Sequence, residues 1–313
     1  MRMEHGGEGC APLDGEYIRF PPRWRNVLVP VGPPSATALG MTLYTASKST
    51  TLAAQYALWS AVRLTGGRLP PPGPRERWTP ALEGGQVAEL HRQWTAAIGR
   101  EPDGVAVYQR LQSSRQNLTL LVAAGARSML VRVRTDPAEL ARERAVSETA
   151  QALGLRTFRV PRLVGSGEAE GLHWVGYELM SRRPHRPRSA LGAEGFAEIT
   201  RLVESVVPRQ PSTPQHWRGA HGDLVPWNLR RGGGHTWLID WEEAAWAPPG
   251  TDEVYLRAVT AALRRGPVHS LTLPPEHEEA RAHWAHVVDV RPASDVEQPF
   301  VERMRVLLSA ASG

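Results

Sequence analysis

A short segment of the chain, HGDLVPWNL at residues 221–229, places a histidine, an aspartate and an asparagine at fixed offsets. The segment LIDWEE follows and contributes Asp240, twelve residues after Asn228. Small polar groups beside apolar runs cost free energy to bury unless they have partners. The carboxylates of Asp223 and Asp240 and the amide oxygen of Asn228 are hard ligands that suit Mg²⁺ bound together with nucleotide phosphates. The pattern therefore indicates an oxygen-rich site for a magnesium nucleotide.

Two short strands are expected to position these residues. The segments WNLRR and TWLID are predicted to pair as a hairpin, with the three glycines at 232–234 forming the turn. A glycine run can also bind phosphate, but that arrangement needs a helix to open directly after it, and none is predicted here. The hairpin would carry Asn228 at its entrance and Asp240 at its exit, so both side chains would reach one edge.

The motif resembles the aminoglycoside phosphotransferase and choline kinase family, small-molecule relatives of protein kinases, through His221-Gly222-Asp223-Leu224, Asn228 and Ile239-Asp240-Trp241-Glu242. Its spacing also fits the kinase catalytic loop H-x-D-L-x-x-x-N. The resemblance implies that Asp223 accepts or orients the substrate hydroxyl and that His221 braces the loop. It also implies that Asn228 and Asp240 bind Mg²⁺, and that Asp252 has a mainly structural role.

The resemblance implies a two-lobed, protein-kinase-like α+β fold with a small strand-rich N-lobe and a mainly helical C-lobe. We expect a poorly patterned extension at residues 1–100, a nucleotide-binding N-lobe at 101–182, and a C-lobe with the catalytic loop and acceptor site at 183–313. The implied reaction moves the γ-phosphoryl group of ATP, with Mg²⁺ as cofactor, to a hydroxyl of a sugar, an aminoglycoside or an amino alcohol. Acidic residues and arginines are mixed over 250–313, so a neutral or anionic acceptor fits as well as a cationic one.

The N-lobe departs from the family pattern at the position of the ATP-binding lysine. The strand MLVRV carries Arg132 at this position. Arginine keeps the charge and binds phosphate through a planar fork of donors, but its length and geometry differ from those of lysine. By the resemblance, its partner on the following helix would be Glu143, with Glu148 as the alternative.

The remaining nucleotide contacts are expected from a loop and a hinge. The loop QSSRQN at 112–117 would cover the phosphates through Ser113 and Ser114, although it contains no glycine. The strand GYELM would form the hinge, where backbone groups near Glu178 and Met180 would meet adenine. The glycine-rich segment GSGEAEG at 165–171 follows a predicted strand, and we interpret it as a hairpin turn.

Regular patterns predict the elements around these residues. In SMLVRVRT, period-2 alternation places the first, third and fifth residues of MLVRV in the core and Leu130, Arg132 and Arg134 on the other face. That second face would meet the nucleotide, or both arginines would simply line a solvated surface. A helix is predicted after Asp136, which suits the N-cap. Further helices are expected at 47–67, 193–207, 252–265, 278–288 and 296–311.

Composition describes an ordinary soluble protein of 313 residues with 41% hydrophobic and 22% charged residues. No run of eighteen apolar residues occurs, so no membrane association is expected. Cys10 is the only cysteine and the first residues lack an apolar signal sequence, so we expect a cytoplasmic protein. The net charge of +5 comes almost wholly from arginine, since Lys48 is the only lysine. No groove-reading motif accompanies this charge, so we expect no nucleic-acid partner. The sequence leaves the oligomeric state open.

One rival chemistry and one rival function class remain as alternatives. Glu279, His283 and His286 would share one helix face and could hold a transition metal, although the sequence lacks the H-E-x-x-H pattern. A hydrolase nucleophile finds no support, because Cys10 has no identifiable partner and no G-x-S-x-G occurs. The alternative function is a non-catalytic kinase-like binding protein, suggested by Arg132 and the glycine-free loop.

Overall fold

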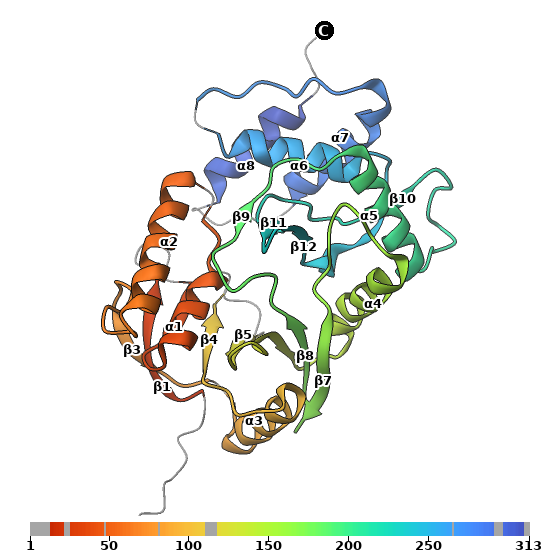
Figure 1. The fold of residues 1–313 in the computed structure, drawn as a ribbon. Coiled ribbons are helices and arrows are strands. Elements are labelled where there is room, and N and C mark those ends of the chain that lie inside the picture. The colour runs from red at the N-terminus through yellow and green to blue at the C-terminus, as the bar shows by residue number, and fades with distance from the viewer. Residues whose placement is uncertain are drawn as a thin grey trace, which may run out of the picture. The chain divides into compact units, whose positions relative to one another are not determined.

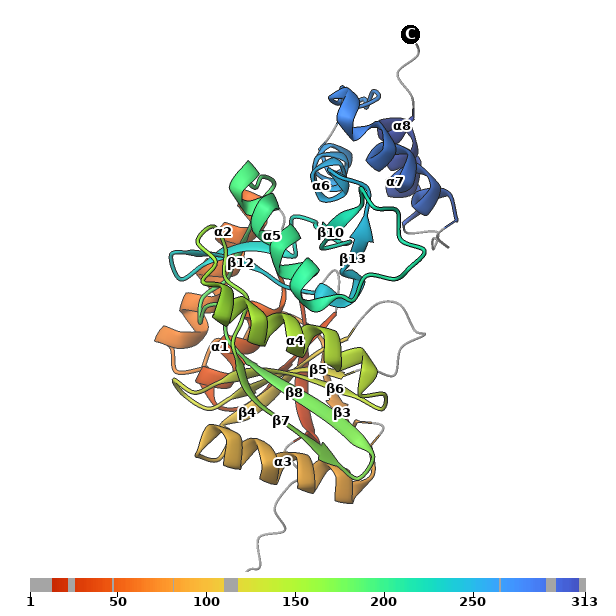
Figure 2. The ribbon, with the colours of Figure 1, turned by 90° about the vertical axis from the view of Figure 1, so that its right-hand side faces the viewer.

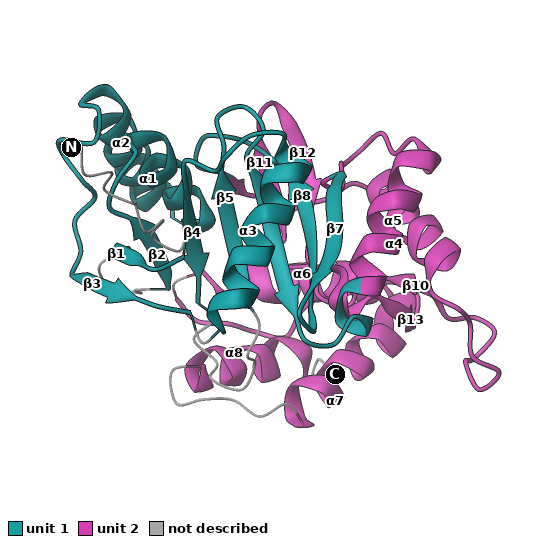
Figure 3. Ribbon diagram, turned by 90° about the horizontal axis from the view of Figure 1, so that it is seen from below, with its two compact units in different colours: residues 1–140, 162–185 teal, residues 141–161, 186–313 magenta. Residues whose placement is uncertain are grey.

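The computed structural model describes residues 13–21, 26–46, 48–80, 82–109, 118–264, 266–290 and 297–309. Within it the chain forms two compact units (Figure 3), of which unit 1 comprises Met1–Leu140 and Arg162–His185, and unit 2 comprises Ala141–Pro161 and Arg186–Gly313. Unit 1 contains a large antiparallel sheet and unit 2 is mainly helical. The predicted α+β fold class, with a strand-rich and a helical part, is therefore confirmed.

Unit 1 is built on an eight-stranded sheet in the order β3-β1-β2-β4-β5-β6-β8-β7 (Figure 1). Its strands are β1 Gly15–Phe20, β2 Val27–Pro30, β3 Arg75–Trp78, β4 Gly104–Tyr108, β5 Leu118–Ala123, β6 Met129–Arg134, β7 Leu163–Ala169 and β8 Leu172–Glu178. All neighbouring strands run antiparallel. The sheet thus joins strands that lie far apart in the sequence.

Helices cover both faces of this sheet (Figure 2). Helix α3, Gly84–Ile98, packs Leu90 and Trp94 on one face against Val131 and other strand residues. Helices α1, Pro34–Gly40, and α2, Ser49–Leu64, lie on the opposite face, where their apolar residues meet strands β2, β4 and β5. Cross-strand register separates the faces, since Val131 pairs with Leu120 while Leu130 pairs with Leu121. The alternation predicted for β6 is therefore observed.

The structure corrects the predicted division of the chain. The sequence predicts a separate extension at residues 1–100, but β1, β2 and β3 extend the same sheet as the predicted nucleotide-binding lobe. The predicted turn at 165–171 is also wrong in part, because its first residues lie inside β7. The turn itself is at Glu170 and Gly171, with φ of 47° and 81°. The first error arises because these strands are short and have few local partners, so their pairing is decided by residues far along the chain.

In unit 2, helices surround two small sheets. Its helices are most of α4 (Ala138–Leu153), α5 Ala193–Val206, α6 Thr251–Ala262, α7 Glu278–Val290 and α8 Gln298–Leu308. Its strands are β9 Arg186–Pro187, β10 Arg218–Ala220, β11 Leu229–Gly232, β12 His235–Leu238 and β13 Ala245–Ala247. Each of the helices predicted beyond residue 190 is present. Among the described residues, no helix is both long and apolar enough to cross a membrane.

Helix α3, which lies within the N-terminal segment, supplies part of the hydrophobic core of unit 1. Trp94 is fully buried in the core cluster that α3 shares with the sheet. We expect Trp94→Ala to lower the free energy of unfolding by about 3–5 kcal/mol, because it removes a large buried side chain and leaves a cavity. Ala96→Ser on the exposed side of α3 is the control and should change this free energy by less than about 0.5 kcal/mol. Urea unfolding measures both, and equal values would show that α3 is not part of the core.

Candidate active site

The hairpin predicted between Asn228 and Asp240 is present in unit 2. Strands β11 and β12 pair antiparallel from Leu229 with Leu238 to the turn, and both of these leucines are fully buried. Gly233 and the glycine after it adopt left-handed φ values of 59° and 85°, which glycine tolerates without strain. The backbone N–H of Ile239 donates to the carbonyl of Asn228 at 3.1 Å. Asn228 and Ile239 therefore flank the first pair of the hairpin, and Asp240 follows directly after Ile239.

A hydrogen bond joins Asn228 to the residue expected to meet the acceptor. The Asn228 amide nitrogen donates to a carboxylate oxygen of Asp223 and to its backbone carbonyl, at 3.0 Å each. Asn228 is 3% exposed. Its amide nitrogen is therefore committed to Asp223, and its amide oxygen is the atom left to meet a metal. The carboxylate of Asp223 is held in one orientation from its own loop.

His221 supports the loop as a neutral side chain. It is fully buried, and burial lowers its pKa to about 4. Its Nδ1 accepts the backbone N–H of Asp223 at 3.2 Å, and its Nε2 lies 3.0 Å from the carbonyl of Ile239. The first contact requires an unprotonated Nδ1, so the proton is on Nε2 and is donated to Ile239. One imidazole thereby connects the loop to the end of the hairpin, and the ring of Trp241 packs against it with 4.5 Å between centroids.

Asp252 fixes the same loop from the start of helix α6. Its two carboxylate oxygens accept the backbone N–H groups of His221 at 2.7 Å and Gly222 at 3.1 Å. The side chain is 6% exposed. Burial raises its pKa to about 6, while the two backbone donors act in the opposite direction by stabilising the charged form. The contacts agree with the structural role implied for Asp252 by its sequence position.

Gly222 is required by the close approach of the loop to the segment after the hairpin. Its φ is +78°, and a Cβ at this position would lie 2.2 Å from the carbonyl oxygen of Glu243. Any other residue would bring both backbone strain and a collision with backbone. The motif glycine is therefore a packing requirement of the loop.

Three carboxylates of unit 2 gather at Asp240. One oxygen each from Glu143, Asp240 and Glu242 lies within 4.8 Å of the others, and Glu143 is buried. Asp240 has a left-handed backbone with φ of 72°. In residues other than glycine this conformation is strained, and it occurs mainly at functional sites. Carboxylate oxygens are the ligands Mg²⁺ prefers, so this donor set fits that ion. Glu242 is not among the candidates predicted from the sequence, although its place two residues after Asp240 could have indicated it.

The predicted nucleotide residues of unit 1 lie on β6 and at the end of β8. Arg132 is 9% exposed, so the alternative of a solvated arginine face is wrong. Arg134 is more deeply buried: its guanidinium donates to the carbonyls of Leu118 and Val133 and pairs with Glu139 at 3.3 Å. Arg134 therefore supports the sheet. Arg132 belongs to unit 1 and Glu143 to unit 2, and their pairing stays a prediction.

In the expected hinge, both the backbone and the side chain of Glu178 are bonded to Arg162. The N–H of Glu178 donates to the carbonyl of Arg162 at 2.9 Å, and its carboxylate accepts from the Arg162 guanidinium at 2.7 Å. These two groups of Glu178 are therefore engaged, and the expectation that backbone groups near Glu178 meet adenine stays a prediction. Met180 stays a prediction, and Ser113 and Ser114 lie outside the described residues.

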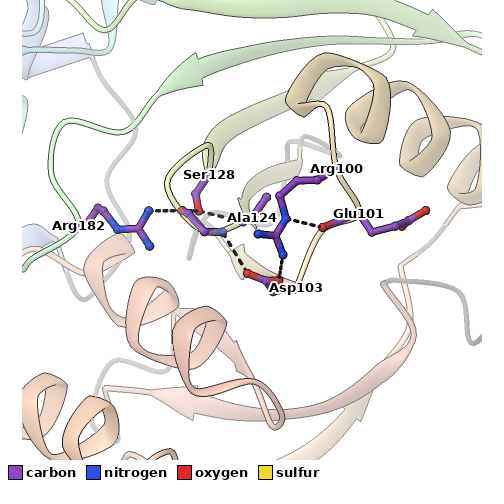
Figure 4. Close-up of polar contacts among 7 residues, drawn as sticks. Arg100, Glu101, Asp103, Ala124, Ser128 and Arg182 are labelled. Atoms are coloured by element: carbon purple, nitrogen blue, oxygen red, sulfur yellow. Dashed lines mark hydrogen bonds and ion pairs between the residues drawn. The ribbon is translucent and has the colours of Figure 1, made fainter.

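The segment after the hinge is anchored to the turn between β5 and β6 (Figure 4). Arg182 donates to the carbonyl of Gly125, and the N–H of Gly125 donates to the carboxylate of Asp103 at 3.0 Å. Arg100 also donates to Asp103, at 2.7 Å. Burial lowers the pKa of the Arg182 guanidinium, which indicates a group drawn in from solvent. These contacts fix where the chain leaves β8.

The rival metal site on α7 is not formed among the described residues. The carboxylate of Glu279 accepts from the indole N–H of Trp217 at 2.9 Å and lies 2.8 Å from His216. Within the described part of the chain, the side chains of the α7 face do not gather as a group of ion ligands. Glu279 instead joins α7 to the segment before β10.

A first prediction concerns Gly222. We expect Gly222→Ala to lower the free energy of unfolding by about 2 kcal/mol more than Gly234→Ala, because overpacking adds to the backbone strain. Gly234 is the matched control, since its φ is +85° and a Cβ added there would meet no atom within 4 Å. Urea unfolding of the two variants measures the difference. Equal destabilisation would mean that the loop does not need the close approach to Glu243.

A second prediction concerns the pH dependence of stability. Between about pH 4 and about pH 6, folded Asp252 keeps a proton that the unfolded chain loses at its ordinary pKa of 3.8, so its contribution to stability falls as the pH rises. His221 acts in the opposite direction, because the unfolded chain holds a proton up to its ordinary pKa of 6.5 that the folded protein lacks. Relative to wild type, Asp252→Asn should gain stability more steeply as the pH rises, and His221→Gln less steeply. Urea unfolding across this window tests the signs, and three parallel curves would contradict both assignments.

Comparison with known proteins adds an independent observation. Residues 107–207 match the phosphotransferase enzyme family. This segment runs from β4 through α5 and ends before the loop at 221–229, so the match does not depend on the loop motif. No curated protein matches the chain.

Several solved structures are similar at low identity. A protein described as a fructosamine-3-kinase from Haemophilus somnus 129PT shares 10% identity, with a TM-score of 0.41, over 72% of this chain and 97% of that one. A spectinomycin phosphotransferase solved with ADP and spectinomycin shares 8% identity, with a TM-score of 0.45, over 70% and 93% of the two chains. A variant of an aminoglycoside 2′-phosphotransferase solved with GDP shares 17% identity, with a TM-score of 0.38, over 69% and 87%. At these TM-scores no conclusion about this chain rests on them. The family match confirms the resemblance predicted from the loop, since residues 107–207 are similar to the phosphotransferase enzyme family.

Proposed function

We propose that this protein is an ATP-dependent phosphotransferase that moves the γ-phosphoryl group to a hydroxyl of a small molecule. The observation that carries the proposal is the orientation of Asp223, whose carboxylate accepts a hydrogen bond from Asn228 on a loop fixed by Asp252. The match of residues 107–207 to a phosphotransferase family supports the same reaction class. Phosphoryl transfer asks a protein mainly for positioning and charge neutralisation, and a fixed carboxylate suits that task.

Asp223 is proposed to accept or orient the hydroxyl of the acceptor. Its side chain is partly buried beside the neutral His221, and a carboxylate can accept a hydrogen bond from an alcohol. Asn228 holds the carboxylate, and His221 holds the backbone N–H of Asp223. A positioned base of this kind contributes about 10²–10⁴-fold to a rate.

Asp240, with Glu143 and Glu242, is proposed to hold the Mg²⁺ that accompanies ATP. The bound ion would supply positive charge to the phosphate oxygens. The three carboxylates lie close enough to share one ion, and Asp240 has the left-handed backbone that non-glycine residues adopt mainly at functional sites. Asn228 is the second ligand that the sequence predicts, and its amide oxygen is the atom that would serve.

Arg132 is proposed to supply a fixed cation to the phosphates from unit 1. Its planar guanidinium donates several hydrogen bonds in a fork that fits phosphate oxygens, in place of the single ammonium of lysine. The acceptor is proposed to be a sugar, an aminoglycoside or an amino alcohol. The second candidate function is a non-catalytic binding protein, because Arg132 replaces the family's lysine. Turnover of any acceptor would exclude this second candidate.

The metal and acceptor roles can be separated by nucleotide binding. We expect ATP with Mg²⁺ to raise the melting temperature of wild type and of Asp223→Asn alike, because Asp223 meets the acceptor. At a ligand concentration of about 100 times Kd the stabilisation is about 2.7 kcal/mol. Asp240→Ala should lose this Mg²⁺-dependent increase, and Glu194→Ala on the exposed face of α5 is the acidic control.

The outcomes of this thermal-shift titration are distinct. Loss of the increase in Asp240→Ala alone supports the assigned roles. An unchanged Mg²⁺ dependence in Asp240→Ala would remove this residue from the metal site. An absence of any Mg²⁺-dependent increase in wild type would contradict the proposed function.

A further inference from the structure

The sheet face that carries Arg132 also defines where an adenine base must lie, if the protein binds ATP as proposed. Along β6, Leu130 separates Arg132 from Met129, and Met129 pairs with Glu178 at the end of β8. A nucleotide that reaches from Arg132 to the chain after β8 must therefore cross Leu130 and its cross-strand neighbour Leu121. These two leucines form the floor of the adenine part of that face.

Helix α1 already lies on this part of the sheet. Its residues Ala36 and Leu39 pack in one buried cluster with Leu121 and with neighbouring residues of β4 and β5. Leu179, which lies between Glu178 and Met180 in the expected hinge, packs against the same cluster. The Leu121 part of the apolar surface that a base would use is therefore in contact with α1.

The contact between α1 and the sheet is close because small residues meet there. A Cβ placed on Gly104 of β4 would lie 3.0 Å from the Cβ of Ala36, and one on Gly40 would lie 2.7 Å from the Cβ of Ala106. The hydroxyl of Thr37 donates to the carbonyl of Pro30 at 2.8 Å. No space for a planar ring is left between α1 and β4.

Helix α2 connects α1 to the segment after the hinge. Gln55 is 2% exposed, and its side-chain amide donates to the carbonyls of Met41 at 2.8 Å and Tyr44 at 2.9 Å, just after α1. The next residue, Tyr56, donates its hydroxyl to the carbonyl of Pro184 at 2.7 Å. Two neighbouring side chains of α2 therefore hold α1 at one end and the hinge segment at the other.

We propose that α1 is an inhibitory element that covers the adenine part of the nucleotide face and has to move before ATP binds. The inference rests on the proposed function and adds a regulation to it. The helix has seven residues, which is too short to be stable by itself, so its place depends on packing alone. When the binding-competent state is a small fraction of the population, the apparent Kd rises by the inverse of that fraction. Release of α1 therefore tightens ATP binding without a change in any residue that touches the nucleotide.

A reversible disulfide tests the proposal directly. Ala36→Cys and Gly104→Cys are combined in a Cys10→Ser background, because the Cβ positions of the pair lie 3.0 Å apart. A disulfide needs a Cβ separation of about 3.8 Å, so the contact has to open by less than about 1 Å. Calorimetric titration with ATP and Mg²⁺ should show binding in the reduced protein and an apparent Kd at least about tenfold weaker in the oxidised protein. The single variant Ala36→Cys, oxidised in the same way, is the control.

Release of the helix gives the opposite result. Leu39→Glu places a charge in the buried contact and should tighten the apparent Kd for ATP by about tenfold or more, while Ser35→Glu on the exposed side of α1 leaves it unchanged. Tyr56→Phe removes one hydrogen bond from a residue that is 38% exposed, so the fold is kept and the affinity should rise by a smaller factor.

Each outcome decides a different question. If ATP binds more weakly to the disulfide form and the affinity is restored on reduction, the inhibitory role of α1 is supported. Equal affinity of the oxidised and reduced forms overturns that role and leaves the proposed function in place. An absence of ATP binding in every form, including a folded Leu39→Glu variant, overturns the proposed function together with the inference.

Discussion

The loop at residues 221–229 depends on the carboxylate of Asp252, which accepts the backbone N–H groups of His221 and Gly222 from the start of α6. These bonds fix the loop by its backbone, so the side chains of the motif remain available for other contacts. The imidazole of His221 accepts a hydrogen bond from the N–H of Asp223 and donates one to the carbonyl of Ile239. The buried charge of Asp252 is stabilised by the N–H groups of His221 and Gly222, which the turn at Gly222 directs toward it. The rest of the site is positioned through this contact.

The site could be predicted from sequence where the interactions are local. Asp223 and Asn228 lie five residues apart and bond to each other, and the hairpin that follows brings Asp240 to the same edge. The types and spacing of these residues already specify the arrangement. The resemblance assigns Glu143 to a different partner, and its approach to Asp240 depends on the packing of α4, which no local pattern reveals.

The N-terminal part could not be predicted because its contacts are distant in sequence. Strand β1 pairs with β3, which begins about sixty residues later, and strand β2 pairs with β4 across α1, α2 and α3. The arginines of β6 show a related limit. Alternation places Arg132 and Arg134 on one face. It cannot reveal that the Arg134 guanidinium donates to backbone carbonyls, or that α1 covers the neighbouring surface.

The most direct test of the account is transfer of labelled γ-phosphoryl from ATP, with Mg²⁺, to pooled hydroxylated small molecules. Wild type and the Leu39→Glu variant are incubated with the pools, and phosphorylated products are separated and counted. We expect a labelled product that requires an acceptor and disappears in Asp223→Asn. Labelled product formed equally by wild type and Asp223→Asn, or no product from either wild type or Leu39→Glu with any pool, would contradict it.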